Sequence, residues 1–452
     1  MITKKSRIFL IVSMPFMTFS VYALPMWTLS PLTQTTISTS PNVPVIIQYV
    51  VTNQSERSRT LAMKPITGIT QSTSAGFCSS PFTLAPHQSC TLTLSTNGIA
   101  SSSSIEGGPT ICLASPNGNP NPNQCYQPCG KDNLNISFTS GPLSLYQSDF
   151  SANLWKCPIS DTGDISGGAC AQLTNSPPFS YTDSSTFGTF SGATYTYVGD
   201  NTTNLWQCPI DALGNFSGNC TSLSNTTPPG FNVTFDVTFA TFSGNTYAYV
   251  TDNSNTLWKC LMNATGGFSG GCTALTNSSG AGFQSTEGVT FMTYSGTTYG
   301  YVSDASHRLW KCPMDENGNI NSGACTALTN STGSHFVSTS QVVFATFAGT
   351  TYLYVNDDTS TLWKCPINES GDITGGACAP LVNINGGFAY STSLSFAMFL
   401  GTTYGYEGDA SSNLWKCPMT TTGDISGVGC TALNNSTSTG FSGTDESVFR
   451  GI

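Results

Sequence analysis

Charged residues are scarce in this sequence, and their scarcity excludes some classes of ligand. Only 8% of the 452 residues are Asp, Glu, Lys or Arg, and the formal net charge is -10 at pH 7. Nucleic acids and anionic membrane surfaces are bound by clusters of Lys and Arg, which an acidic chain of this kind lacks. The sequence therefore predicts no nucleic-acid partner.

Histidine is scarcer still, with His87, His307 and His335 as the three residues of its kind. They neither recur in the repeats described below nor cluster in the sequence, so no Ser–His–Asp triad or His-rich metal site is expected. The sequence accordingly predicts no metal, no cofactor and no catalytic residue. A glycosidase pair of carboxylates stays open, because the chain has 24 Asp and Glu residues whose distances are unknown.

Long apolar runs are missing after the first residues. Residues 1–23 have a basic start at Lys4 and Lys5 and an apolar core that ends at Phe19, which is the pattern of a secretory signal peptide. No later stretch reaches the roughly 18 apolar residues of a membrane helix. The sequence thus predicts a secreted, periplasmic or cell-surface protein with no transmembrane segment after signal cleavage.

Repetition is what the sequence has in abundance. Six tryptophans recur at intervals of 51 to 53 residues, and each is followed by two cysteines at fixed spacing. Such a period predicts repeated supersecondary units, and regular cysteine pairs in an exported chain predict one disulfide in each unit. The tryptophans are Trp155, Trp206, Trp258, Trp310, Trp363 and Trp415. The cysteine pairs are Cys157/Cys170, Cys208/Cys220, Cys260/Cys272, Cys312/Cys325, Cys365/Cys378 and Cys417/Cys430.

One repeat, read through, contains four strand-like segments. The stretches 289–294 and 298–302 alternate around a turn signal at Ser295-Gly296, and 309–313 and 325–328 follow. Four strands in about 52 residues make one propeller blade, and no window shows apolar residues at helical spacing. We expect an all-β chain whose residues 141–452 form a six-bladed β-propeller with one disulfide within each blade. This region distantly resembles the NHL, kelch and lectin propeller groups in architecture.

Two details of this propeller follow from the spacing. If the turn of a middle hairpin is Asp252–Asn255, Tyr249 lies opposite Trp258. The first repeat lacks a first strand of its own, and Ser447–Ile452 is favoured to supply it from the other end of the chain. Closing the ring in one shared blade removes exposed strand edges. Ile136 and Phe138 are the alternative.

Residues 24–140 carry no such repeat and form a separate domain. Strand-like segments at 45–53 and 90–94 predict an antiparallel β-sandwich. The segment 76–92, with Leu84-Ala85-Pro86-His87-Gln88-Ser89-Cys90, resembles the immunoglobulin-like domains of the ASPM-SPD-2-Hydin type, with His87 where those have Gly. The resemblance implies an Ig-like sandwich without catalytic residues.

Five cysteines fall in this domain. Cys78 with Cys90 is the first expected pair, and Cys112 with either Cys125 or Cys129 is the second, which leaves one thiol over. Cys125 and Cys129 as half of a metal site are the alternative, disfavoured because the sequence has no second close-spaced pair of Cys or His.

Two polar residues also recur with the repeats. An Asp follows each second strand, where it is expected to hold its own turn, with a ligand or cation site as the alternative. A Lys follows five of the tryptophans, and Gln207 follows the sixth. The Lys stem is expected to pack between blades with its ammonium group in solvent. Binding of an anionic ligand by these Lys residues is the alternative. The Asp residues are Asp149, Asp200, Asp252, Asp304, Asp357 and Asp409, and the Lys residues are Lys156, Lys259, Lys311, Lys364 and Lys416. The loops at 161–164, 211–214 and 315–318 have too few carboxylates for calcium and are expected to be hairpin loops.

These features describe a rigid, acidic, exported scaffold with loops rich in Asn, Ser, Thr and Tyr. They predict a protein that is not an enzyme, a secreted or envelope binding or adhesion protein that engages a glycan or protein ligand through one propeller face. Two alternatives stay open. One is a glycoside-type hydrolase with a carboxylate pair in the propeller channel, and the other is a structural component of envelope assembly.

Overall fold

The computed structural model describes residues 25–39, 43–96, 104–138, 143–280, 282–305, 308–331, 336–357, 360–437 and 440–451. The expected signal peptide at 1–23 and the expected boundary near 140 lie outside these ranges. Strands dominate the described part, where no helix is long and apolar enough to cross a membrane. Its helices are the 3-10 turns η1 (Gly130–Asp132), η2 (Ser166–Gly168), η3 (Asn321–Gly323) and η4 (Thr374–Gly376).

The residues up to Phe138 form a sandwich of sheets. Four-stranded sheets of order β1-β3-β7-β5 and β10-β9-β4-β6 are accompanied by a three-stranded sheet, β2-β11-β8. Trp27 and Leu92 of the first sheet and Leu61 and Ile111 of the second share one apolar core. The strands are β1 (Trp27–Pro31), β2 (Thr36–Thr39), β3 (Ile46–Asn53), β4 (Arg59–Met63), β5 (Ile69–Ser72), β6 (Phe82–Leu84), β7 (Ser89–Thr96), β8 (Ile105–Glu106), β9 (Ile111–Ala114), β10 (Pro120–Tyr126) and β11 (Asn135–Phe138).

The residues from Leu143 onward form six four-stranded antiparallel sheets. Five of them take their strands consecutively, and one combines β14, β13 and β12 with β35. The strands are β12 (Leu143–Asp149), β13 (Asn153–Pro158), β14 (Ala171–Leu173), β15 (Ser184–Phe190), β16 (Ala193–Gly199), β17 (Leu205–Pro209), β18 (Thr221–Leu223), β19 (Thr234–Phe242), β20 (Asn245–Asp252), β21 (Leu257–Leu261), β22 (Thr273–Leu275), β23 (Thr286–Tyr294), β24 (Thr297–Asp304), β25 (Arg308–Pro313), β26 (Thr326–Leu328), β27 (Thr339–Phe347), β28 (Thr350–Asp357), β29 (Thr361–Pro366), β30 (Ala379–Leu381), β31 (Ser391–Phe399), β32 (Thr402–Asp409), β33 (Leu414–Pro418), β34 (Thr431–Leu433) and β35 (Thr444–Gly451).

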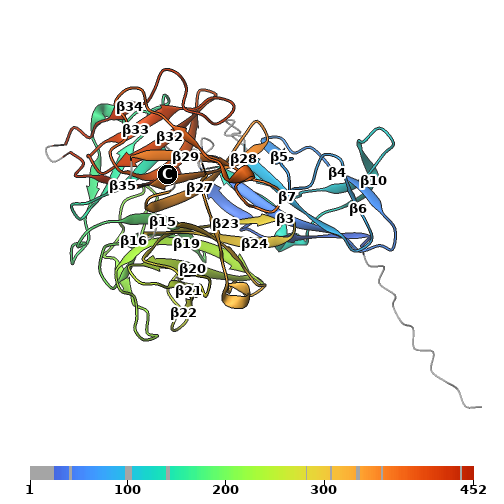
Figure 1. The fold of residues 1–452 in the computed structure, drawn as a ribbon, viewed down its shortest axis with the longest axis horizontal. Coiled ribbons are helices and arrows are strands. Elements are labelled where there is room, and N and C mark those ends of the chain that lie inside the picture. The colour runs from blue at the N-terminus through green and yellow to red at the C-terminus, as the bar shows by residue number, and fades with distance from the viewer. Residues whose placement is uncertain are drawn as a thin grey trace, which may run out of the picture.

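The first strands of these sheets lie side by side in a closed ring. Neighbours contact one another in the order β15, β19, β23, β27, β31 and β35, and β35 also contacts β15. We call these six the innermost strands, and the space they enclose the channel. Sheets that fan out from such a ring form a β-propeller. Figure 1 shows these sheets, in green to red, on one side of the molecule and the blue N-terminal strands on the other.

The strand β35 closes the ring. It pairs antiparallel with β12, and Leu145 lies opposite Phe449. The other candidates, Ile136 and Phe138, lie in β11, which pairs with β2 and β8 of the sandwich. The closing strand favoured from the sequence is therefore the one observed, and it removes an unpaired edge from the first sheet.

Disulfides cross-link every sheet of the propeller. Each repeat pairs its own two cysteines, as the spacing predicts: Cys157–Cys170, Cys208–Cys220, Cys260–Cys272, Cys312–Cys325, Cys365–Cys378 and Cys417–Cys430. In the sandwich, Cys78 pairs with Cys90 and Cys112 with Cys125. Cys129 is the free cysteine of the described part and is exposed. A metal site that uses Cys125 is excluded, because its sulfur is in a disulfide.

The expected register of the middle hairpin is wrong by one residue. Val250 pairs with Trp258, and Tyr249 pairs with Lys259. The unpaired loop runs over 252–256, one residue more than the predicted turn, because Asp252 turns back to accept a hydrogen bond from the Trp258 indole. Tyr249 and Trp258 therefore lie on opposite faces of the sheet, each in a different core between neighbouring sheets.

The N-terminal sandwich packs against one end of the propeller. Thr293 N donates to Gln48 Oε1 at 3.1 Å, and Gln48 Nε2 donates to Thr293 O at 3.3 Å. The ring of Phe77 stacks on that of Tyr294 with centroids 5.2 Å apart. These propeller residues lie where β23 ends, so the sandwich meets the mouth of the channel formed by the C-terminal ends of the innermost strands.

Candidate functional site

The repeated Asp residues hold the structure together inside each sheet. Asp252 Oδ1 accepts the backbone N–H of Ser254 at 3.1 Å, and its Oδ2 accepts the indole N–H of Trp258 at 2.9 Å. The expected role of holding a turn is thus extended by a bond to the buried Trp. The same indole bond joins Trp155 to Asp149, Trp206 to Asp200, Trp310 to Asp304, Trp363 to Asp357 and Trp415 to Asp409.

The repeated Lys residues join neighbouring sheets. Lys416 Nζ donates to Thr162 O at 2.7 Å and to Asp164 Oδ1 at 2.8 Å, both in the loop of the next sheet around the ring. It also lies over the ring of Tyr404, 4.7 Å from the centroid. The expectation that the ammonium group lies in solvent is wrong, because it bonds to the neighbouring loop. Equivalent bonds are made by Lys156, Lys259, Lys311 and Lys364, and Gln207 Nε2 donates to Thr265 O in the same way.

A repeated tyrosine and a repeated asparagine, which the sequence analysis did not single out, make two further joints. Tyr406 donates its hydroxyl to Gly163 O at 2.7 Å, and Asn435 Oδ1 accepts from Cys170 N at 3.1 Å. Both bonds recur around the ring and link its last repeat to its first. Their signal in the sequence is the recurrence of Tyr in each second strand and of Asn after each short fourth strand. The repeated polar residues therefore serve the fold, and a functional site must come from positions where the repeats differ.

Such positions lie where the innermost strands begin. The two residues after the repeated Thr or Ser at the start of each innermost strand line one cavity of about 110 Å³ in the channel. Five of the twelve are acids, gathered from four different strand starts. The lining residues at these positions are Asp183, Ser184, Phe235, Asp236, Glu287, Gly288, Ser340, Gln341, Thr392, Ser393, Asp445 and Glu446. We call this the acidic cavity.

Burial raises the pKa values of four of these acids, Asp183, Asp236, Asp445 and Glu446. Burial, with the charges of Glu287 and Asp200 nearby, raises the pKa of Asp183 to about 8. Oδ2 of Asp183 has no hydrogen-bond partner among the described residues, which also disfavours the charged form. Burial raises the pKa of Asp236 to about 6, against hydrogen bonds from the backbone N–H groups of Val237 and Val289.

The pKa values of the neighbouring acids on β35 are raised as well. Burial, followed by the charge of Asp183, raises the pKa of Asp445 well above its usual range. Burial and the charge of Asp236 do the same for Glu446, although Ser185 N donates to its Oε2 at 2.7 Å and Gln341 Nε2 to its Oε1 at 3.2 Å. The cavity therefore holds Asp183, Asp445 and Glu446, whose pKa values are strongly raised, beside Asp236, whose pKa is about 6.

Two larger cavities lie between the sandwich and the propeller. One of about 1100 Å³ is lined by residues of β1, β2 and β11 together with β15, β19 and β35. Another of about 770 Å³ is lined by residues of the sandwich together with β27, β31 and β35. Gln341 and Glu446 line both this second cavity and the acidic cavity, so they stand between the two. The channel thus leads from carboxyl groups toward the sandwich.

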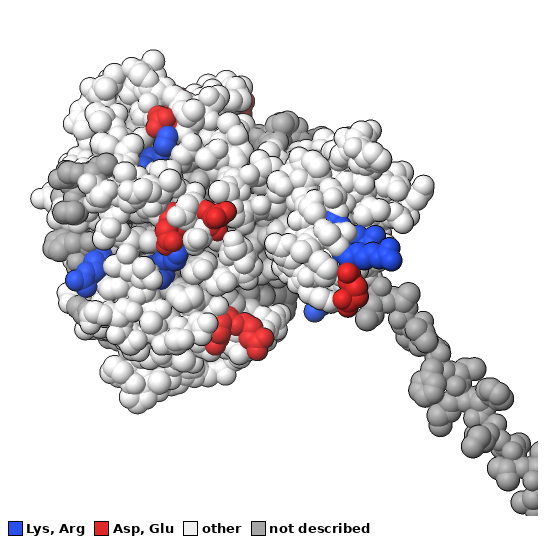
Figure 2. Space-filling view, turned by 45° about the vertical axis from the view of Figure 1, so that its right-hand side comes forward, with Lys and Arg blue, Asp and Glu red and all other residues white. Residues whose placement is uncertain are grey.

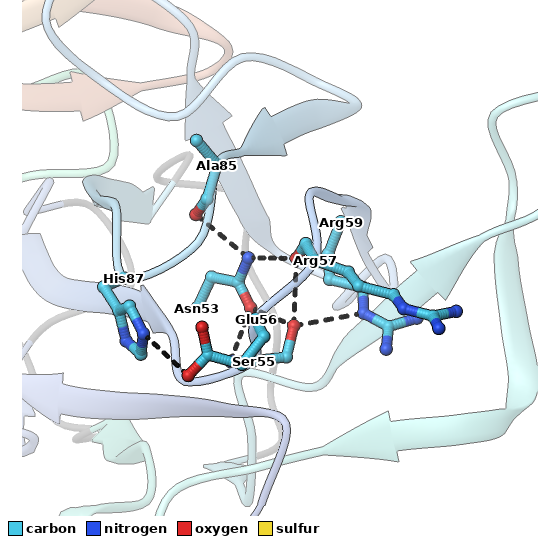
Figure 3. Close-up of polar contacts among 7 residues, drawn as sticks. All are labelled: Asn53, Ser55, Glu56, Arg57, Arg59, Ala85 and His87. Atoms are coloured by element: carbon cyan, nitrogen blue, oxygen red, sulfur yellow. Dashed lines mark hydrogen bonds and ion pairs between the residues drawn. The ribbon is translucent and has the colours of Figure 1, made fainter.

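The remaining charged side chains give no comparable cluster in the described part. Figure 2 shows a face that is mostly uncharged, with acidic and basic groups scattered over it. His87 makes a 3.3 Å contact with Glu56 at the exposed tip of the sandwich, next to the loop that Asn53 and Ser55 hold together (Figure 3). His307 and His335 lie outside the described residues. No group of Asp, Glu, His and Cys in the described ranges is placed to hold a metal ion.

Comparisons with known proteins identify similar structures but no family. No protein-family model matches the chain, and no curated protein sequence matches it. An α-L-arabinofuranosidase from Clostridium thermocellum is 11% identical to this chain, with a TM-score of 0.36. The match covers 59% of this chain and 96% of the arabinofuranosidase. An exo-1,5-α-L-arabinanase from a bovine ruminal metagenomic library is 12% identical, with a TM-score of 0.36. The match covers 54% of this chain and 95% of the arabinanase. The periplasmic gluconolactonase of Pseudomonas aeruginosa is 11% identical, with a TM-score of 0.40. The match covers 69% of this chain and 99% of the gluconolactonase.

These findings correct the function expected from the sequence. The expected protein is a binding or adhesion protein without catalysis, whereas each of the three similar structures is named as an enzyme. The interpretation as a non-enzyme is therefore wrong. At these identities and TM-scores the likeness carries no particular activity to this chain, whose chemistry depends on its own channel.

The bond between Asp and Trp predicts a local cost in stability. Replacing Asp252 by Ala leaves the buried indole N–H of Trp258 without its acceptor and removes the side chain that holds the turn. We expect the free energy of unfolding to fall by about 1–3 kcal/mol, the cost of an unsatisfied buried donor. Denaturant unfolding with intact disulfides measures it, and Asp161→Ala at an exposed loop position is the control. Equal stability of the two variants would contradict this role.

The raised pKa values predict that stability falls as the pH rises. The folded protein binds the proton of Asp183 more tightly than the unfolded chain, where the pKa is near 3.8. This contribution to stability is complete below that pH and is lost as the pH rises through about 8. Thermal unfolding from pH 4.5 to pH 9 should show a smaller fall for Asp183→Asn than for the unmodified protein, while Asp161→Asn should leave the fall unchanged. An unaltered slope in Asp183→Asn argues against the shift.

Proposed function

We propose that the protein is a hydrolase that cleaves a glycosidic bond in the acidic cavity. The observation that carries the proposal is the pair of unequal acids in one cavity: Asp183 with a pKa of about 8 and Asp236 with a pKa of about 6. Near pH 7 the first is mainly protonated and the second mainly ionised. Environments that separate the pKa values of two carboxyl groups in this way are typical of a general acid and its general base.

The two acids divide the reaction between them. Asp183 donates its proton to the glycosidic oxygen as the bond from that oxygen to the anomeric carbon breaks. Asp236 accepts a proton from the water that adds to the anomeric carbon, so the protons balance over one turnover. Glu446, fixed by Ser185 N and Gln341 Nε2, is a further neutral carboxyl at the border of the cavity.

The rest of the lining suits a sugar. Ser184, Ser340, Thr392, Ser393 and Gln341 supply hydroxyl and amide groups beside the acids. The hydroxyls of Ser340, Thr392 and Ser393 donate to backbone carbonyls, so their oxygens can accept hydrogen bonds from sugar hydroxyls. The small volume of about 110 Å³ leaves no room for a long sugar chain within the cavity itself.

We further propose that the chain is exported and has the organisation expected from its sequence. Residues 1–23 are the signal peptide, 24–140 an Ig-like sandwich, and 141–452 a propeller in which each of the six four-stranded sheets is one blade. Support for export comes from the eight disulfides, which persist in an oxidising compartment such as the periplasm or the exterior. The likeness to the NHL, kelch and lectin propellers stays a prediction.

The proposal predicts a bell-shaped dependence of kcat/KM on pH. The rate should rise as Asp236 ionises near pH 6 and fall as Asp183 loses its proton near pH 8. A panel of 4-nitrophenyl glycosides identifies the sugar that is cleaved and then measures the profile. Asp183→Asn should lower kcat by roughly 100-fold or more and remove the upper limb, and Asp236→Asn should remove the lower limb.

A matched control and a contrary result are available for this test. Glu56→Gln changes an exposed acid of the sandwich, 88% of whose side chain is accessible, and should keep full activity. Release of 4-nitrophenol that persists unchanged in both channel variants would place the reaction elsewhere. No cleavage of any member of the panel by the unmodified protein would overturn the proposed function.

A further inference from the structure

The second of the two cavities between the sandwich and the propeller has a mainly apolar lining, in contrast to the polar acidic cavity. Val43 and Ile46 of the sandwich line it from one side, and Val343, Met398 and Val448 of the innermost strands line it from the other. We call this space of about 770 Å³ the apolar chamber. It lies between the sandwich and the innermost strands of the propeller.

The side chains around the apolar chamber are left partly uncovered. Val43, Ile46, Val343, Met398 and Val448 are all half-buried. Exposed apolar surface that gathers in a concave site is a feature of ligand pockets. A ligand that covers such surface gains roughly 25 cal/mol for each Å² removed from water. The chamber is therefore suited to an apolar group.

The chamber and the acidic cavity meet at two residues. Gln341 and Glu446 line both spaces, and they are bonded to each other across the channel at 3.2 Å. Gln341 Oε1 also accepts the backbone N–H of Leu394 at 2.6 Å, which ties the pair to β31. A molecule bound among the carboxyl groups therefore has the chamber on its far side, beyond Glu446.

We propose that the substrate is a glycoside with an apolar aglycone, whose alkyl or aryl group occupies the apolar chamber while the sugar lies among the carboxyl groups. The inference rests on the proposed function and adds the chemical class of the leaving group. The glycosidic oxygen then lies near Glu446 and Gln341, between the two spaces. On cleavage the aglycone leaves as an alcohol or phenol, with the proton that Asp183 supplies.

Binding to the chamber is tested without any reaction. N-phenyl-1-naphthylamine, an uncharged dye that fluoresces in apolar surroundings, is titrated into the full chain. We expect saturable binding that is weakened at least tenfold in the double variant Val343→Thr, Met398→Gln, which makes the lining polar at nearly constant volume. Val382→Thr, at a valine that is 65% exposed outside the chamber, is the matched control and should bind as the unmodified protein does. Equal thermal unfolding of the three proteins shows that each is folded.

Hydrolysis tests the same inference through the substrate. With the sugar found from the panel, KM for methyl to octyl glycosides should fall about fourfold for each added methylene until the chamber is filled. In the double variant this gain should shrink, while in Val382→Thr it should stay as large as in the unmodified protein.

The outcomes separate the two proposals. If KM does not depend on the length of the alkyl chain and no dye binds, the proposal of an apolar aglycone is wrong, while the proposed hydrolase activity is unaffected. Dye binding that responds to the double variant, with no glycoside cleaved, overturns the hydrolase and the aglycone together, and leaves an apolar binding site. Chain-length dependence that survives unchanged in the double variant would also overturn the assignment to this chamber.

Discussion

A buried hydrogen bond from a tyrosine hydroxyl to a glycine carbonyl joins each propeller sheet to the next, and the ring depends on it. Tyr249, for example, donates to Gly318 O at 2.7 Å. The glycine has a φ of 76°, and a Cβ there would overlap the tyrosine hydroxyl itself. Glycine is therefore required by both its backbone conformation and the close approach. Each such joint seals the core that two neighbouring sheets share, so a fault at one joint would open that core.

The division of labour between repeated and unrepeated residues follows from this ring. Tyr, Lys and Asn recur because every interface between sheets must be made in the same way, and the Asp–Trp pair recurs because it holds each sheet together internally. The two positions at the start of each innermost strand face the channel and carry no such demand, so they vary among Asp, Glu, Ser, Thr, Gln, Gly and Phe. Closing the strands into a ring brings the acids together, and burial with repulsion then sets their protonation. The raised pKa values of these acids are therefore a consequence of closing the ring.

Much of the fold could be predicted from the sequence, because spacing reports on repeats directly. The interval between tryptophans gives the sheets, the cysteine pairs give the disulfides, and the missing first strand of the first repeat points to Ser447–Ile452 as the closing strand. The hairpin register could not be predicted, since Asp252 holds a loop one residue longer than a tight turn needs. The Lys heads were misplaced because their acceptors lie in the next repeat, a contact that spacing within one repeat does not show.

The acidic cavity was the least accessible part to sequence reasoning. A carboxylate pair in the channel was an open alternative, yet Asp183 and Asp236 lie 53 positions apart in the chain and at different offsets in their repeats. The available signal was weak: the positions after each repeated Thr or Ser are the ones where the repeats disagree. Only the ring geometry shows that those disagreements face one another.

The shared first sheet has a consequence for how the protein matures. Strand β35 follows every other described strand in the chain, and it carries Asp445 and Glu446 into the cavity as it pairs with β12. A nascent or clipped polypeptide without it is an open arc that lacks two of the five acids and one wall of the cavity beneath the sandwich. The acidic cavity is therefore complete only once β35 has paired with β12.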